Sequence, residues 1–525
     1  MRVRPAVACL LSLALAACAV EPSDGDPAVN DDVDLTSLTA RQRTLAFEGV
    51  VYVEPGSSND AIVEAARKQA RSAFGALLHQ EVAVQTRELQ NVDAKSFKKR
   101  NVTVVEPGAA DGAPMIEVKY TYRDNAVVPV KMATKTALNI ALLSAGAEDK
   151  TAEIVAACTK NDKEAREDAE AGLLWYNFDP SRATCKKALE AEARQIEQDT
   201  SALADPKTQV ARSRVDRVYL PSTAQLASAA NATDATYPEY DRLFAGPSQP
   251  GVLTISIVNG RLAHERVEAR KDSGYYEWLA ALDVIFTEHP DFALTKIEPH
   301  EEITYAYAEN KKYDGLSFAD FIQWTVYGRG WPKGMPASSR DNIAKTIADK
   351  LDNHWVTFEK KTKVQIGNKA PQDLTIRIET FFGVDDDTAP HRRALKHGDV
   401  VVYNGHSYIG EGPLDPANYT KDSFSKGYQM FWFDSCVSYN YYEKDFFLLK
   451  EGGSKNLDLI TNGLEAPEWM SGEAEGKFIA KLIGGTNPSY GALLQLAKAT
   501  DALRVVDGEI DNKWSAAKTP IKFVR

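Results

Sequence analysis

An imidazole and a thiol each follow an apolar run of the chain: His406 comes after residues 400–403 (VVVY) and Cys436 after residues 428–433 (YQMFWF). A thiol attacks a carbonyl carbon as its thiolate, so a neighbouring base that takes the thiol proton is the minimum apparatus for a cysteine nucleophile. Histidine suits this task because its side chain titrates near neutral pH. His406 and Cys436 are therefore the predicted catalytic pair.

The two apolar runs are the elements that must position this pair. Short continuous apolar runs bounded by turn residues indicate strands that are buried on both faces, as in a parallel sheet. The interval 410–427 between them is long enough for the crossover that parallel strands require. Ligands bind beyond the carboxyl ends of such strands. If the two strands are neighbours, His406 and Cys436 emerge side by side at one edge of the sheet.

The order of elements predicts an α/β domain over residues 251–525, because strands and helices alternate there as in βαβ units with a mostly parallel sheet and flanking helices. A smaller α+β domain is predicted over residues 41–128, where a helix and alternating strands share one apolar face. Residues 129–219 are predicted to be mostly helical by composition. Residues 220–250 are rich in Pro, Ser, Ala, Thr and Gly and are predicted to be a linker.

The N-terminus reads as an export signal. Arg2 and Arg4 precede an apolar stretch, and Leu15-Ala16-Ala17-Cys18 resembles a bacterial lipobox. This resemblance implies that residues 1–17 are removed, that Cys18 carries lipid, and that the acidic residues 18–40 form a tether. The protein would then be held by lipid alone to a bacterial membrane, at its periplasmic face or at the cell surface. The alternative is an ordinary secretion signal that leaves Cys18 free.

Five cysteines occur in the chain. Cys9 leaves with the signal peptide and Cys18 is assigned to the lipid. In an exported protein the pair Cys158 and Cys185 is then predicted to form a disulfide. Cys436 is left without a partner, so it is either a buried, inert side chain or one retained for its reactivity.

The residues around the predicted pair, NGH after the first run and DSCVSY after the second, resemble the caspase, gingipain, legumain and separase clan of cysteine peptidases. In that clan one strand ends in His-Gly and the next ends in the nucleophilic Cys, whereas papain-like enzymes place Cys before His. The resemblance implies a caspase-like fold and peptide-bond hydrolysis, in which Cys436 attacks the carbonyl carbon and His406 acts as acid and base. It also implies an oxyanion site formed by the backbone N–H groups of Cys436 and Ser407.

One residue departs from the clan. Ser407 stands where the clan has glycine, so a requirement for positive φ at this position would strain the backbone. The alternative function is a non-catalytic caspase-like lipoprotein that binds peptides or proteins at its surface. In that case Cys436 is a small buried hydrophobe and His406 a hydrogen-bonded loop residue.

Other classes of partner and cofactor are disfavoured. The net charge of −12 argues against a nucleic-acid partner, because proteins that bind nucleic acids concentrate positive charge against phosphate. No phosphate-cradling glycine loop occurs, and no cofactor is predicted. The acidic run 385–387 could bind calcium, but a solvated loop is favoured and no metal is predicted. His391 and His397 fit no zinc spacing and are predicted to lie at the surface. The predicted partners are a peptide or protein substrate and, through the lipid, a membrane.

Overall fold

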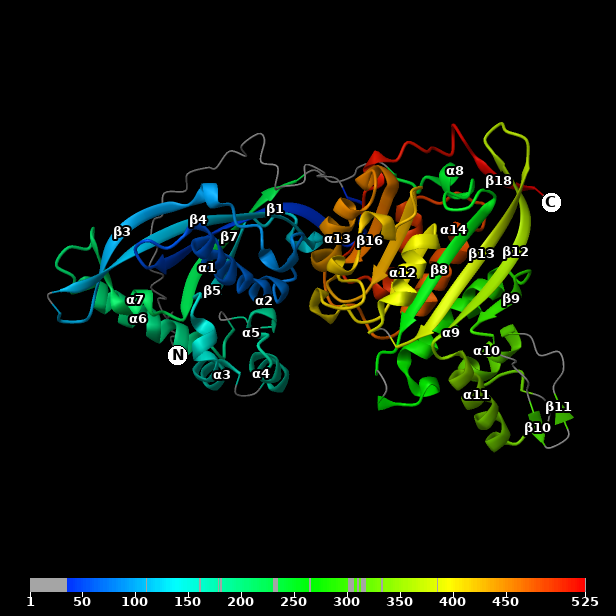
Figure 1. Ribbon diagram of the computed structural model, residues 1–525, viewed down its shortest axis with the longest axis horizontal. Coiled ribbons are helices and arrows are strands. Elements are labelled where there is room, and N and C mark those ends of the chain that lie inside the picture. Colours follow the sequence, from blue (N-terminus) through cyan, green and yellow to red (C-terminus); the bar gives the residue numbers. More distant parts are fainter. Residues whose placement is uncertain are drawn as a thin grey trace, which may run out of the picture.

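Two large sheets, one in each of two lobes, organise the chain (Figure 1). The computed structural model describes residues 35–524 apart from 110, 160–161, 178, 180–181, 230–234, 264–265, 301–305, 309–310, 313–317, 332–333 and 385. The predicted signal peptide, the lipid site at Cys18 and most of the predicted tether lie outside the described residues. Both sheets carry flanking helices, which confirms the mixed α/β class of the fold. Among the described helices, none combines the length and apolar character that crossing a bilayer requires.

The sheet of the N-terminal lobe has the strand order β5-β7-β1-β4-β3-β6, and the short β2 pairs with β4. β1 pairs with β4 in antiparallel fashion along its whole length. Helices α1 and α2 pack on one face of the sheet through Ile62, Ala66 and Phe74. The strands are β1 (Ala40–Val53), β2 (Ala83–Val84), β3 (Lys98–Val105), β4 (Gly112–Pro129), β5 (Ala137–Leu143), β6 (Gln209–Ala211) and β7 (Tyr219–Ser228), and the two helices are α1 (Asn59–Arg71) and α2 (Ala73–Leu78).

The boundaries of this lobe differ from those predicted. The segment 220–250, expected to be a linker, begins within β7, which pairs with both β1 and β5. The stretch 129–219 likewise contributes β5 and β6 to the sheet in addition to helices. Pro221 lies in the part of β7 that pairs with β5 alone, because β1 pairs only with residues 225–228, and proline is tolerated at such an edge. One sheet therefore spans residues 40–228.

A helical group at the end of this lobe carries the predicted disulfide. Cys158 and Cys185 are joined, as expected, across 27 residues. Both side chains are buried in a small apolar cluster with Ile154 and Tyr219. The group comprises α3 (Thr151–Cys158), α4 (Lys163–Glu170), α5 (Leu174–Asn177) and α6 (Lys186–Ser201), followed by α7 (Arg212–Val215).

The sheet of the C-terminal lobe has the order β17-β16-β15-β14-β8-β13-β12-β18, and β9 pairs with β12. Its five strands β13, β8, β14, β15 and β16 are mutually parallel, as predicted. The outer strands β17, β12, β18 and β9 are antiparallel to their neighbours, which the sequence did not indicate. The strands are β8 (Val252–Gly260), β9 (Ala293–Glu298), β12 (His354–Ile366), β13 (Gln372–Gly383), β14 (Val400–Asn404), β15 (Gln429–Asp434), β16 (Leu457–Asn462), β17 (Arg504–Asp507) and β18 (Ile521–Val524), with a separate pair β10 (Ala306–Ala308) and β11 (Lys311–Lys312).

Alternate residues of the central strands enter two different apolar cores. Val402 and Trp432 belong to the core beneath the helices α9, α10, α11, α14 and α15. Tyr403 and Phe433 belong to the opposite core, which includes α12, α13 and the apolar side chains of the N-terminal lobe. The two lobes therefore share one continuous core. The helices are α8 (Tyr240–Leu243), α9 (Ser273–Glu288), α10 (Phe318–Tyr327), α11 (Ala337–Leu351), α12 (Thr388–His397), α13 (Ser438–Leu449), α14 (Ser471–Leu482) and α15 (Tyr490–Leu496).

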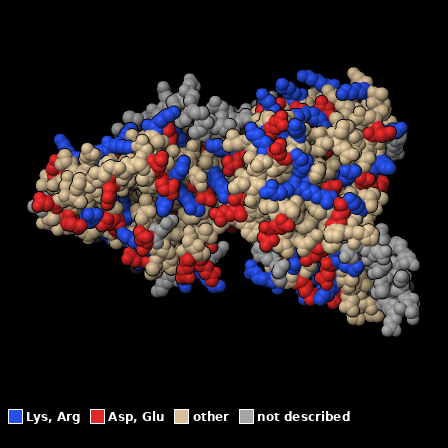
Figure 2. All heavy atoms as spheres, in the orientation of Figure 1, with Lys and Arg blue, Asp and Glu red and all other residues tan. Residues whose placement is uncertain are grey.

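Polar contacts reinforce the junction between the lobes at α13. The Asn440 side chain donates hydrogen bonds to the carbonyl oxygens of Val84 (3.0 Å) and Thr86 (2.9 Å). An ion pair joins Arg87 to Asp415 at 2.8 Å. Figure 2 shows acidic and basic side chains interspersed over both lobes and a notch between their lower parts. In Figure 1, α4 and α5 lie on one side of this notch.

Candidate functional site

The predicted pair emerges at one edge of the C-terminal sheet. β14 ends at Asn404 and β15 ends at Asp434, and these two residues are register partners in neighbouring parallel strands. His406 and Cys436 each follow two positions later. Both residues therefore lie beyond the ends of neighbouring parallel strands, at the carboxyl edge of the sheet. The structure thus brings the two predicted residues to one edge, as the order of strands led us to expect.

The imidazole of His406 is held by the loop that follows β8. Its Nε2 lies 2.8 Å from the carbonyl oxygen of Leu262, so Nε2 carries the proton and donates it to that oxygen. A neutral imidazole with Nε2 protonated has its acceptor at Nδ1. The Tyr403 hydroxyl donates to the carbonyl oxygen of His406 at 2.7 Å, which fixes the backbone at this position. Nδ1 is therefore the atom of His406 that could accept a proton.

The thiol of Cys436 is partly buried and neutral. Cys436 is the free cysteine of the described chain. Burial is the main cause that raises the pKa of its thiol to about 11; the charges of Glu465 and Asp434 act in the same direction, and a hydrogen bond from the Ala466 backbone N–H acts against them. The thiol consequently needs a base when it attacks, rather than existing as a preformed thiolate at neutral pH.

The backbone turns sharply directly after Cys436. Val437 has φ 51° and lies in the left-handed region, and α13 begins at the next residue. A β-branched side chain is strained in this conformation. Such strain persists only where the surrounding structure over-determines it, and it is concentrated at functional sites. The Val437 N–H donates to the carbonyl oxygen of Leu464 at 3.0 Å. This strand–turn–helix geometry presents Cys436 at the tip of the turn.

Ser407 adopts an ordinary backbone conformation. Its φ is −81° and its ψ is −17°, so a side chain causes no strain there. Positive φ values follow instead at Tyr408 (50°) and Ile409 (55°). Ser407 is buried, and its carbonyl oxygen accepts a hydrogen bond from the Tyr442 hydroxyl at 2.9 Å. The departure from glycine is thus compatible with the fold, while the oxyanion role of its N–H stays a prediction.

A row of buried polar side chains crosses the sheet immediately before the predicted pair. The row consists of Asn259, Asn404, Asp434, Asn462 and Arg504 on five neighbouring strands. Asn404 is the register partner of both Asn259 and Asp434, and Asn462 is the register partner of Arg504. Arg504 pairs with Asp434 at 2.9 Å, and the Asn462 amide donates to the same carboxylate at 2.6 Å. The row ties together the strand ends from which the site projects. Sequence reasoning assigned no role to it, although a polar residue ending each of four apolar runs was a visible signal.

Two helix carboxylates lie against this polar row. Burial raises the pKa of Glu475 well above its ordinary value, and the charges of Asp434 and Glu277 add to the shift. Glu277 accepts hydrogen bonds from the backbone N–H groups of Met470 (3.0 Å) and Gly472 (2.6 Å), which hold the start of α14 against α9. Burial thus disfavours the charged form of Glu475, and Glu277 holds the start of α14 in place beside the site.

The N-terminal lobe reaches the thiol through α5. Burial raises the pKa of Tyr176, and the charges of Glu465 and Cys436 add to this effect. Tyr176 stacks on Phe74 with ring centroids 5.4 Å apart, and Phe74 faces Tyr441 of α13 at 6.3 Å. The helical group closed by the disulfide therefore places an aromatic side chain beside Cys436. Neither Tyr176 nor Leu262 could be assigned to the site from sequence spacing.

The remaining candidates lie elsewhere in the structure. Asp387 caps α12 by accepting from the Ala389 N–H at 2.9 Å, Asp386 is exposed, and Asp385 lies outside the described residues. Within the described part of the chain, no group of three His, Cys, Asp or Glu side chains is arranged to hold a metal ion. The surface prediction is right for His397 but wrong for His391, which is buried against Tyr403 because α12 turns that face to the sheet. Burial lowers the pKa of His391 to about 4.

No protein-family model, curated protein or solved structure matches the chain.

Proposed function

We propose that the protein is a cysteine-dependent hydrolase that cleaves peptide bonds, with Cys436 as nucleophile and His406 as acid and base. One observation carries the proposal: both residues lie two positions beyond the same register pair, Asn404 and Asp434, at the carboxyl edge of a parallel sheet. The parallel core and the His-before-Cys order support membership of a caspase-like fold. The strained turn at Val437, which presents the thiol, supports a functional rather than a structural role.

The neutral thiol determines the order of proton transfers. As the sulfur of Cys436 attacks the substrate carbonyl carbon, Nδ1 of His406 takes the thiol proton and a C–S bond forms. The imidazolium then gives this proton to the leaving amine, the C–N bond breaks and a thioester remains on Cys436. Water hydrolyses the thioester, with His406 again as base. The backbone N–H groups of Cys436 and Ser407 are proposed to stabilise the oxyanion.

The proposal includes a location. The lipobox-like segment ending at Cys18 supports export and attachment by lipid to a bacterial membrane. The disulfide between Cys158 and Cys185 is consistent with an oxidising compartment, because such bonds persist where thiols are not kept reduced. The substrates would be peptides or proteins at the periplasmic face of a membrane or at the cell surface.

A second candidate function is peptide or protein binding without catalysis. Two observations favour it: the raised pKa of the Cys436 thiol and the hydrogen bond that engages His406 with Leu262. A binding module would keep the same fold and the same edge but would show no dependence of thiol chemistry on the imidazole.

Labelling with a peptidyl acyloxymethyl ketone separates the two functions, because the enzyme must activate its thiol towards an electrophile that resembles a substrate. We expect the native protein to be labelled at Cys436, Cys436→Ala not to be labelled, and His406→Ala to react at least about 100-fold more slowly, the range typical of general acid–base catalysis. His397→Ala, which changes an exposed histidine, is the matched control and should react like the wild type. Equal rates in the two histidine variants would favour the binding module.

A further inference from the structure

The loop of residues 465–470, which joins β16 to α14, contacts both Cys436 and the first turns of α9. The Ala466 N–H bonds to the Cys436 sulfur at one end of this loop. At the other end, Glu468 accepts from the Ser273 hydroxyl at 3.1 Å and the Met470 N–H donates to Glu277 at 3.0 Å. The surface over residues 465–470 and the start of α9 is therefore continuous with the proposed site.

Large apolar side chains are exposed along this surface. Trp469, Met470, Tyr276 and Tyr327, here called the aromatic patch, expose between 41% and 67% of their surface. They are four of the nine large apolar side chains that the described part of the chain exposes. Tyr327 joins α10 to this surface because its hydroxyl bonds to Asp283 of α9. Clustered exposed apolar side chains mark interaction sites, whereas scattered ones do not.

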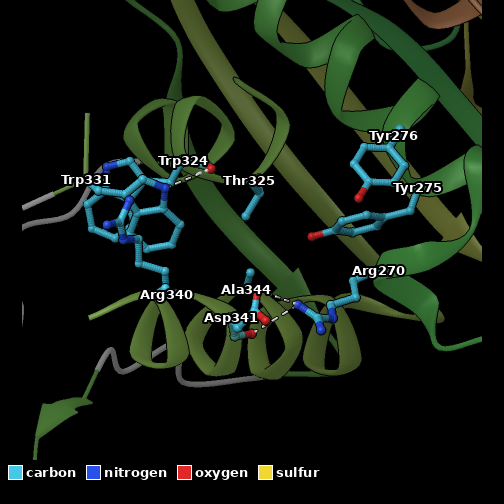
Figure 3. Close-up of a pocket in the computed structure, with 10 residues that line it drawn as sticks. Arg270, Tyr275, Tyr276, Trp324, Thr325, Trp331, Arg340, Asp341 and Ala344 are labelled. Carbon is cyan, nitrogen blue, oxygen red and sulfur yellow. Dashed lines mark hydrogen bonds and ion pairs between the residues drawn. The ribbon is translucent and has the colours of Figure 1, made fainter. Parts of the chain in front are cut away.

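A cavity of about 320 Å³ lies between α9, α10 and α11, and Tyr276 of the aromatic patch forms part of its wall. Figure 3 shows the hydroxyl groups of Tyr275 and Tyr276 facing this space from one side and the Trp324–Trp331 stack from the other. The tryptophan ring centroids are 4.6 Å apart. Ligand pockets start near 300 Å³, so this cavity lies at the lower end of their range and has room for an aromatic side chain.

Both guanidinium groups at the cavity already have partners inside the protein, and Arg340 donates to the carbonyl oxygen of Met335 at 3.3 Å. Arg270 pairs with Asp341 at 3.3 Å and lies 3.6 Å from a Glu268 oxygen, while Arg340 lies over the Trp331 ring at 5.7 Å. A guanidinium that is already paired has little to gain from a second carboxylate. Aromatic ring edges and guanidinium groups instead favour the faces of an aromatic guest. The cavity therefore suits an aromatic ring better than an acidic or aliphatic side chain.

We propose that the cavity and the aromatic patch bind an aromatic side chain of a polypeptide whose backbone passes Cys436. The identity of this polypeptide as a substrate rests on the proposed hydrolase function. Binding itself does not rest on it, because the walls of the cavity contain neither His406 nor Cys436.

Peptide binding to the full-length Cys436→Ala protein tests the proposal without cleavage. The probes are fluorescein-labelled dodecapeptides of Gly, Ser and Thr that carry two adjacent Phe residues, or two Leu or two Glu residues at the same positions. We expect fluorescence anisotropy to show the Phe peptide binding about tenfold more tightly than the others, because one ring contributes contacts worth about one decade in Kd. Adding Ala344→Phe, which fills the cavity from α11, should abolish this preference. Thr346→Phe, exposed on the same helix, should leave it unchanged.

The patch has its own test. Trp469→Ala should weaken binding of the Phe peptide severalfold, whereas Leu448→Ala, equally exposed on α13, should not. Equal affinity for the three peptides, no binding of any, or a preference that survives Ala344→Phe in a folded variant would overturn the inference. A Phe preference in a protein whose wild type cleaves nothing would refute the hydrolase but retain this site. Cleavage without the preference would refute this inference alone.

Discussion

The raised pKa of Cys436 makes a quantitative prediction for its reaction with iodoacetamide, a small alkylating agent. With a pKa of about 11 instead of 9.0, the thiolate fraction at pH 8 falls about 100-fold. A more basic thiolate is also more nucleophilic, and with a Brønsted slope of about 0.45 the two-unit shift restores roughly eightfold. We therefore expect alkylation at pH 8 to be about 10-fold slower than in the unfolded chain, before any further loss from limited access.

The assay follows the Cys436 peptide by mass spectrometry from pH 7 to pH 10.5, with urea-unfolded protein as the reference. The rate in the folded protein should still be rising steeply at pH 10, whereas the reference is half-maximal near pH 9 and nearly level about one unit above it. Glu465→Gln should raise the folded rate at pH 8, because one charge that disfavours the thiolate is removed. Glu451→Gln, an exposed residue after α13, is the matched control. A folded rate equal to the reference, or one that is half-maximal near pH 9, would refute the reasoning.

Three further predictions concern the residues around the site. Arg504→Met leaves the Asp434 carboxylate buried without its ion pair, so urea unfolding should show a free energy of unfolding lower by about 3–5 kcal/mol. Unchanged stability would contradict the role of the polar row. Ser407→Gly should lower stability by only about 0.5–1 kcal/mol and keep probe labelling within about twofold, because φ is already ordinary; a large gain in labelling would show that the serine obstructs the site. Burial raises the pKa of Asp458 from 3.8 to about 7, so the folded state favours the protonated carboxyl more than the unfolded state does. This preference contributes about 4 kcal/mol to the free energy of unfolding. The contribution is complete below pH 3.8 and is lost as the pH rises to 7. Unfolding of Asp458→Asn between pH 4 and pH 7 should lack that slope, and a slope identical to that of the wild type would rule out this titration.

The strands of the site could be predicted because burial on both faces leaves a signal within each segment. β14 and β15 read as continuous apolar runs; the predicted bounds of β14 differ from the observed ones by one residue at its end, and those of β15 by one residue at each end. β12 was missed because its half-exposed lysines interrupt the pattern, and β17 because it is short and begins with Arg504. Both strands are defined by pairing with their neighbours, which a local sequence pattern does not encode.

The catalytic candidates could be predicted, but their surroundings could not. His406 and Cys436 follow from strand order and the rule that parallel strands end at one edge. Leu262, Ala466 and Tyr176 come from two loops and from the other lobe, and tertiary packing alone brings them to the site. The raised pKa of Cys436 depends on those contacts, so residue types could suggest a nucleophile but not its protonation state.

Hydrolysis of a fluorogenic peptide mixture tests the central claim most directly, that Cys436 is a nucleophile served by His406. Wild type, Cys436→Ala and His406→Ala are compared at equal concentration, after thermal unfolding has shown that all three are folded and equally stable. The account predicts cleavage by the wild type and a loss of kcat of about 1,000-fold or more in both variants, because residues that act as a unit fail together. An inactive wild type, or cleavage that survives Cys436→Ala, would contradict it.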